Sequence, residues 1–218
     1  MSQYNKGTNT RNLLLKTAKS LFFEQGYHAT TTRQIAEKSN VNLGLIKYHF
    51  ESKANIALAI YTELRDSFDR ALLPEQYSDA EKLLIGSAVE FILCHNSPEF
   101  LRFYTEIYME PVIHDLFQSK IVSLEHHNPE DEIFFRLHSV AFSFMKPSLI
   151  AYAATEEGKQ IPLKQYILYY MQQQINAYHL GSPELAAQSC EKLQKFYFNV
   201  AANFTPVITK VSDKPFFR

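Results

Sequence analysis

The chain has 218 residues, of which 46% are hydrophobic and 21% charged, a balance typical of folded globular proteins and not of disordered ones. Its two cysteines, Cys94 and Cys190, are too few for a disulfide-rich secreted scaffold. No apolar run approaches the roughly 18 residues of a membrane-spanning helix, and the first residues are polar, unlike a signal peptide. We therefore expect a cytoplasmic protein that makes no membrane contact.

The charge is distributed unevenly along the chain. The net charge is −1, but residues 1–60 hold eight Lys and Arg against three Glu, a net charge of +5. The remaining residues carry a net charge of −6. A basic N-terminal segment on an acidic body is the asymmetry expected when one end of a protein meets phosphate and the rest does not.

Nearly the whole chain has the apolar spacing of helices, and the alternation typical of strands is hard to find. Thr10 is predicted to cap the first helix, Gly26 to end it, and Ser52 to cap the fourth. The predicted helices span residues 11–25, 32–38, 43–49, 53–64, 79–95, 98–109, 111–124, 130–152, 163–180 and 183–204. The predicted fold is all-α, with a three-helix N-terminal head joined by a long helix to a larger helical body.

Residues 32–50 have the features of two short helices joined by a tight turn. Ala36 supplies the small residue needed where the helices cross, and Asn40 tolerates the left-handed backbone of the turn. Val41 and Ile46 are placed to fix the second helix against the first. The segment predicts a helix-turn-helix, a motif whose second helix enters the major groove of DNA.

With its flanks, this segment resembles the DNA-binding head of the TetR (tetracycline-repressor) family. The family pattern GY…TxxxIA…VxxGx(L/I)Yx(H/Y)Fx(S/N)K is matched at most positions by Gly26-Tyr27, Thr30 to Ala36, Val41 to Phe50 and Ser52-Lys53. Two departures are Lys47, where the family usually has an aromatic residue, and Asn40, where it usually has glycine. Both departures bear on which operator is read, and DNA binding itself remains expected.

The resemblance implies a set of DNA contacts. Thr32 is expected to bind a phosphate and Arg33 the edge of a guanine, while the start of the second helix reads bases. His49 and Lys53 are expected to fix the DNA backbone. The predicted contacts are Thr32, Arg33, Asn42, Leu43, Gly44, Lys47, Tyr48, His49 and Lys53. The alternative interpretation is that the threonines only cap a helix, and that Arg33, Lys47 and Lys53 only lie on a solvent-exposed face.

The resemblance also implies that residues 1–53 bind DNA and that residues 54–218 bind a small-molecule effector and form a homodimer. The apolar helices near 132–157 and 163–180 are the predicted subunit interface, with residues 183–204 as an alternative. The alternative interpretation is that the aromatic side chains there form intramolecular core instead. Dimerisation follows physically, because one recognition helix reads too few bases and a two-fold pair reads two half-sites.

An aromatic-rich helix between Pro98 and Pro111 is the predicted effector pocket. Its predicted lining residues are Phe100, Phe103, Tyr104, Ile107 and Tyr108. Glu106 and Glu110 lie one turn apart on this helix, and carboxylates among aromatic rings favour a cationic effector. The simpler interpretation buries the aromatic residues in the core and leaves both glutamates in water.

The predicted function is that of a ligand-responsive homodimeric repressor, which releases double-stranded operator DNA when a small molecule binds. No cofactor or metal is expected. The sequence has no GxSxG, P-loop, dinucleotide-binding or HExxH motif, so we expect no enzyme. Glu125-His126-His127 is a weak metal candidate, because adjacent histidines on a helix point to different faces. The alternative function is a helical scaffold or ligand-binding protein without operator binding.

Overall fold

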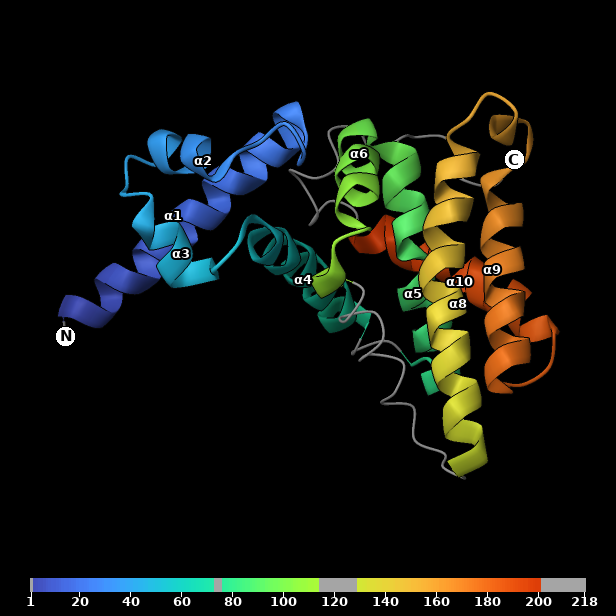
Figure 1. Cartoon of the computed structure of the whole chain (residues 1–218). Helices are drawn as coiled ribbons and strands as arrows, with labels where there is room; N and C mark the ends of the chain where they lie inside the picture. The colour runs from blue at the N-terminus through green and yellow to red at the C-terminus, as the bar shows by residue number, and fades with distance from the viewer. Residues whose placement is uncertain (1, 73–75, 114–128, 201–218) are drawn as a thin grey trace.

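The computed structural model describes residues 2–72, 76–113 and 129–200 (Figure 1). Within these ranges the regular structure is helical throughout, as predicted. The α-helices in these ranges are α1 (Ser2–Gln25), α2 (Thr32–Lys38), α3 (Gly44–Phe50), α4 (Lys53–Leu72), α5 (Asp79–Asn96), α6 (Pro98–Ile107), α8 (Pro129–Ala153), α9 (Leu163–Tyr178) and α10 (Glu184–Val200). None of these described helices is long and apolar enough to cross a membrane.

The predicted bounds of α2, α3 and α5 agree with the structure to within one residue. α2 spans the predicted residues, and α3 begins one residue later than predicted. The prediction that Thr10 caps α1 is wrong, because the helix begins at Ser2 and continues through Thr10. Most of the predicted helix over 111–124, and the Glu125-His126-His127 segment, lie outside the described residues.

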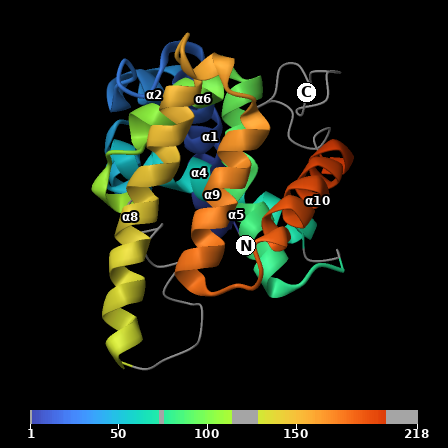
Figure 2. The same cartoon turned by 90° about the vertical axis from the view of Figure 1, so that its right-hand side faces the viewer.

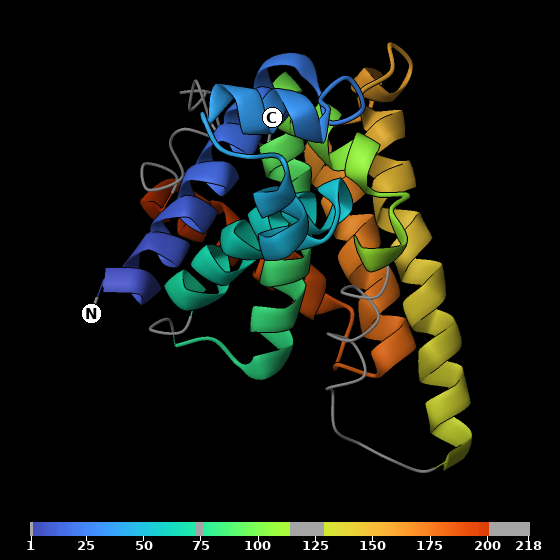
Figure 3. The ribbon, with the colours of Figure 1, turned by 60° about the vertical axis from the view of Figure 1, so that its left-hand side comes forward.

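Helices α1, α2 and α3 form the head at one end of the molecule (Figure 1), and Figure 3 shows the same head brought toward the viewer. Gly26 ends α1 with a φ of +99°, a left-handed conformation that side-chain-bearing residues rarely adopt. The head core is made by the buried faces of all three helices together with the start of α4. Its fully or almost fully buried residues include Leu14, Ala18, Phe22, Ile35, Ala36, Ile46, Phe50 and Ile56. The head is thus a small packed unit in which the buried faces of α2 and α3 hold their exposed faces in place.

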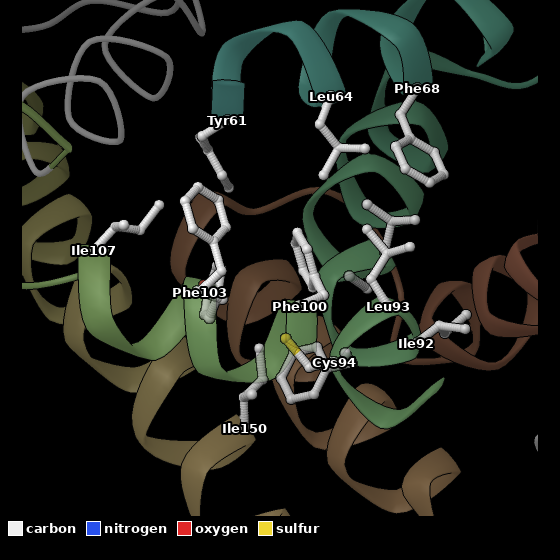
Figure 4. Packing of buried hydrophobic residues seen from close by; sticks show 14 of the residues in the cluster. Tyr61, Leu64, Phe68, Ile92, Leu93, Cys94, Phe100, Phe103, Ile107 and Ile150 are labelled. Carbon is white, nitrogen blue, oxygen red and sulfur yellow. The ribbon is translucent and has the colours of Figure 1, made fainter. Parts of the chain in front are cut away.

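The body is built around α5, which contacts α4, α6, α9 and α10. Figure 4 shows Tyr61 and Leu64 of α4 pointing toward Phe103 and Phe100 of α6. Because α5 is surrounded, its residues from Leu84 to Cys94 are buried almost without interruption. Helices α8 and α9 run side by side on one outer face (Figure 2).

A buried ion cluster joins three helices of the body. Glu90 of α5 is 1% exposed; its Oε1 lies 3.0 Å from Arg65 Nη1 of α4 and accepts a hydrogen bond from the Tyr61 hydroxyl at 2.7 Å. Its Oε2 lies 3.3 Å from Lys146 Nζ of α8. Burial raises the pKa of Glu90, but Arg65, Lys146 and Tyr61 outweigh it and hold the pKa below its ordinary value. The carboxylate therefore stays charged inside the core.

Candidate DNA-binding surface

The first turn of α2 is set by the threonines that precede it. The Gln34 N–H donates to Thr31 Oγ1 at 3.2 Å, and the Thr31 N–H donates to Gln34 Oε1 at 2.8 Å, which forms a reciprocal cap. Thr30 is fully buried and its hydroxyl donates to the Gly26 carbonyl at 2.7 Å. Thr32 and the exposed Arg33 are left in the first turn of the helix, where backbone N–H groups favour an anion.

The turn between α2 and α3 has the predicted geometry. Asn40 adopts a φ of +53°, as expected of the residue that replaces the usual glycine. The Val41 N–H donates to the Ala36 carbonyl at 3.0 Å across the turn. Ala36 and Ile46 are each 3% exposed, so the two helices cross at a small residue and are fixed by an apolar one.

Helix α3 turns one face to the head core and the other to solvent. Just before the helix, Asn42 Oδ1 accepts a hydrogen bond from the Gly44 N–H at 2.8 Å. On the inner face Ile46 and Phe50 are buried. On the outer face Tyr48 is 80% and Leu43 45% exposed, so both side chains are accessible to a partner.

The remaining predicted contacts on α3 lie around this outer face. Gly44 and Lys47 are exposed, and His49 is half-buried with its ring 4.9 Å from that of Tyr48. Figure 1 shows that α2 and α3 both lie at the end of the molecule away from α8 and α9. Eight of the nine predicted residues are therefore gathered at the start of α2 and along α3, on one end of the head.

Lys53 differs from the other predicted contacts. Its Nζ donates to the carbonyls of Tyr27 at 2.9 Å and Thr30 at 3.0 Å, and it lies 4.1 Å from the centre of the Tyr27 ring. Burial lowers the pKa of Lys53, and the carboxylates of Glu110 and Glu106 raise it. Lys53 thus binds backbone carbonyls within the head, and its contact with a DNA phosphate stays a prediction.

The five predicted pocket residues belong to the core. Phe100, Phe103, Tyr104 and Ile107 are at most 1% exposed, and Tyr108 is 7% exposed. The hydroxyl oxygen of Tyr104 is buried with no hydrogen-bond partner among the described residues. A cavity of about 350 Å³ lies on the other side of α6 and is lined by Phe91, Cys94, His95, Pro98, Leu101, Ile150, Ala153, Ala154, Lys159 and Leu163. An effector site on the five aromatic and aliphatic residues stays a prediction.

The segment that forms this surface is similar to a known protein family. The family model described as bacterial regulatory proteins of the tetR family matches residues 14–60, which run from α1 into α4. Residues 14–60 therefore form a tetR-family domain. The predicted family and the predicted all-α fold are thereby confirmed.

Individual tetR-family relatives match only part of the chain. QacR, an HTH-type transcriptional regulator of Staphylococcus aureus, is 30% identical over 106 residues, which are 46% of this chain and 56% of QacR. TcmR, an HTH-type transcriptional regulator of Streptomyces glaucescens, is 40% identical over 63 residues, 29% of this chain and 28% of TcmR. The chain thus spans little more than half the length of QacR and less than a third of TcmR.

A solved structure extends the likeness of fold to the body. TylP, a tetR regulator from Streptomyces fradiae, aligns with 88% of this chain and 97% of its own at a TM-score of 0.52. Its sequence is 16% identical, so the likeness shows the fold alone. What the body of this chain binds is argued from its own residues.

Proposed function

We propose that this protein is a homodimeric transcriptional regulator that binds operator DNA through α2 and α3 and releases it when a small molecule binds the body. The observation that carries the proposal is the outer face of α3, where Tyr48 and Leu43 are exposed beside Lys47. This combination of apolar and cationic side chains is suited to the major groove, where thymine methyl groups offer apolar contacts and base edges offer hydrogen-bond acceptors. The relatives are named as transcriptional regulators, which supports the same function.

The proposed DNA contacts divide into two kinds. Thr32 and His49 hold phosphates, and Arg33, Lys47 and Tyr48 reach base edges. Because Lys47 is a flexible point charge where the family has an aromatic residue, this operator is expected to offer it a guanine or a phosphate. The net charge of +5 over residues 1–60 attracts the duplex as a whole.

Homodimerisation is supported by an exposed apolar stripe on α8. Ile133, Leu137, Val140 and Phe144 are spaced by four, three and four residues, and are 66%, 65%, 40% and 47% exposed. Tyr169 of the neighbouring α9 is 52% exposed. A row of large apolar side chains at this spacing is typical of an interface between helices. We propose that α8 and α9 of two copies form a four-helix interface, in agreement with the predicted helices 132–157 and 163–180.

We propose that the body, residues 54–218, senses the effector through α6. The five predicted pocket residues lie on α6 and at its C-cap, and the Tyr104 hydroxyl among them has no hydrogen-bond partner within the described residues. Leu101 of α6 lines the cavity. An effector that binds one arrangement of α6 better than another shifts the operator affinity by linkage. This scheme does not depend on a cofactor.

Selection of binding sites from random duplex DNA tests the function. The wild-type protein is expected to enrich a sequence with two related half-sites, because a dimer presents two copies of α3. Binding to the selected duplex is then measured by fluorescence anisotropy at several salt concentrations, beside Arg33→Ala. The variant is expected to lose about 1–3 kcal/mol of discrimination at one base pair of each half-site. Equal binding to all duplexes would favour the scaffold alternative.

A further inference from the structure

Three charged side chains, two on α6 and one just after its end, reach from the body to the head. Arg102 Nη2 donates to the Phe23 carbonyl at 2.7 Å, in the last turn of α1. Glu106 Oε2 accepts from the His28 N–H at 3.0 Å, and Glu110 Oε1 accepts from the Tyr27 hydroxyl at 2.6 Å. The expectation that both glutamates lie in water is therefore wrong. We refer to Arg102, Glu106 and Glu110 as the α6 clamp.

The clamp closes on the turn between α1 and α2, residues 26–31. At Gly26 a Cβ atom would lie 3.0 and 3.1 Å from the two carboxylate oxygens of Glu106, and 3.4 Å from Arg102 Nε. The glycine thus ends α1 in a left-handed conformation and at the same time lets the carboxylate approach the backbone. The close approach leaves the turn little room to shift relative to α6.

Lys53 of α4 holds the same turn. As the first residue of α4, it donates to the Tyr27 and Thr30 carbonyls and lies over the Tyr27 ring. Tyr27 is 2% exposed, so its ring, its hydroxyl and its carbonyl are all engaged. Burial raises the pKa of Tyr27, and the hydrogen bond to Glu110 raises it further, which keeps the hydroxyl a proton donor.

The clamped turn leads directly into the DNA-binding surface. Thr30 is tied to Gly26 through its hydroxyl, and Thr31 caps α2, so the turn and the first turn of α2 form one stiff unit. Thr32 and Arg33 follow at once. A shift of α6 therefore moves the start of α2 through the turn, in addition to any movement that the long α4 transmits.

We propose that Glu106 and Glu110 are positioning residues that set the angle of the DNA-binding head on the body. In the proposed dimer this angle fixes the separation of the two α3 helices, so the clamp sets which spacing of half-sites is bound. The inference rests on the proposed function.

The apolar contact between α1 and α6 makes the clamp separable from folding. Phe23 stacks on Phe103 at 5.1 Å and Phe22 on Phe103 at 6.0 Å between ring centres. These rings keep α6 against α1 when the carboxylates are removed. Loss of the clamp is therefore expected to loosen the angle of the head without unfolding it.

The test compares operator spacing preference in Glu106→Ala/Glu110→Ala, in Tyr27→Phe and in the control Glu63→Ala. Glu63 is an exposed residue of α4, so the control removes a carboxylate without touching the turn. The probes are the duplex selected by the wild-type protein and two versions with one base pair added or removed at its centre. The double variant is expected to bind the selected duplex about tenfold more weakly and the altered duplexes almost as the wild type does, which flattens the preference.

The outcomes separate the two proposals. If the wild-type protein enriches no sequence, the proposed function fails and the clamp inference fails with it. If it selects an operator, but the double variant keeps the spacing preference of Glu63→Ala within about twofold, only the clamp inference is overturned. Thermal melting checks that each variant folds. If the melting temperature of the double variant is well below that of the wild type, Tyr27→Phe becomes the test of the clamp inference. This variant removes only one hydroxyl, and it is expected to flatten the spacing preference in the same direction.

Discussion

The buried Glu90 allows a quantitative test of what holds the body together. Its carboxylate lies between Arg65 and Lys146, whose side chains are 11% and 9% exposed. Glu90→Gln keeps the shape of the side chain and removes its charge, which leaves two cations in the core. Asp69, 44% exposed and 3.4 Å from Arg65, remains as a counter-charge beside Arg65. Because removing one partner of a buried ion pair costs about 3–5 kcal/mol, we expect a loss of about 3 kcal/mol of unfolding free energy at pH 7.

The pH dependence of this loss has a definite sign. The pKa of Glu90 is lower in the folded protein than in the unfolded chain, because Arg65, Lys146 and Tyr61 outweigh the effect of burial. A group of this kind contributes stability that is fully present above its unfolded-state pKa and is lost as the pH falls through its folded-state pKa. The difference between wild type and Glu90→Gln is therefore expected to be full at pH 7 and to shrink below about pH 4.

Guanidinium denaturation followed by circular dichroism measures both quantities, at one fixed protein concentration because a dimer gains stability by mass action. Glu156→Gln is the matched control, since Glu156 is 92% exposed in its ion pair with Lys159. The control is expected to leave the midpoint unchanged. A Glu90→Gln variant within about 0.5 kcal/mol of the wild type at pH 7 would refute the reasoning that the cluster stabilises the fold.

Three further changes have expected outcomes. Leu137→Glu places a charge in the exposed stripe of α8, so sedimentation is expected to show a monomer at concentrations where the wild type is a dimer; an unchanged dimer would exclude α8 from the interface. Tyr48→Ala is expected to weaken operator binding at least tenfold with an unchanged melting temperature, because the side chain is 80% exposed; equal affinity would remove Tyr48 from the DNA contacts. Gly26→Ala is expected to lower the unfolding free energy by about 1–3 kcal/mol, since the φ of +99° strains any side chain; a stable variant would contradict this.

The head was predictable because its determinants are local. A run of threonines, a small residue at the helix crossing and an asparagine in the turn are read directly from neighbouring positions. The structure places Thr31 as the cap of α2 and Asn40 at a φ of +53°. The start of α1 was mispredicted, because the hydroxyl of Thr10 resembles a cap while nothing before it interrupts the helix.

Contacts between distant segments were not predictable from the same patterns. The spacing of Phe100, Phe103, Tyr104 and Ile107 indicates one apolar face, but it does not tell whether that face meets a core or a cavity. Glu106 contacts a turn that lies 78 residues earlier in the chain. Glu90 was missed, although a single carboxylate within the apolar run from Leu84 to Cys94 indicates a buried partner.

The central claim is that α2 and α3 read the sequence of operator DNA. The most direct measurement is the binding of the wild-type protein and Arg33→Ala to a selected duplex and to a scrambled duplex, at several salt concentrations. The account predicts nanomolar binding to the selected duplex that falls steeply with salt, and a loss of discrimination of about 1–3 kcal/mol in the variant. Equal and weak binding of the wild type to both duplexes would contradict it.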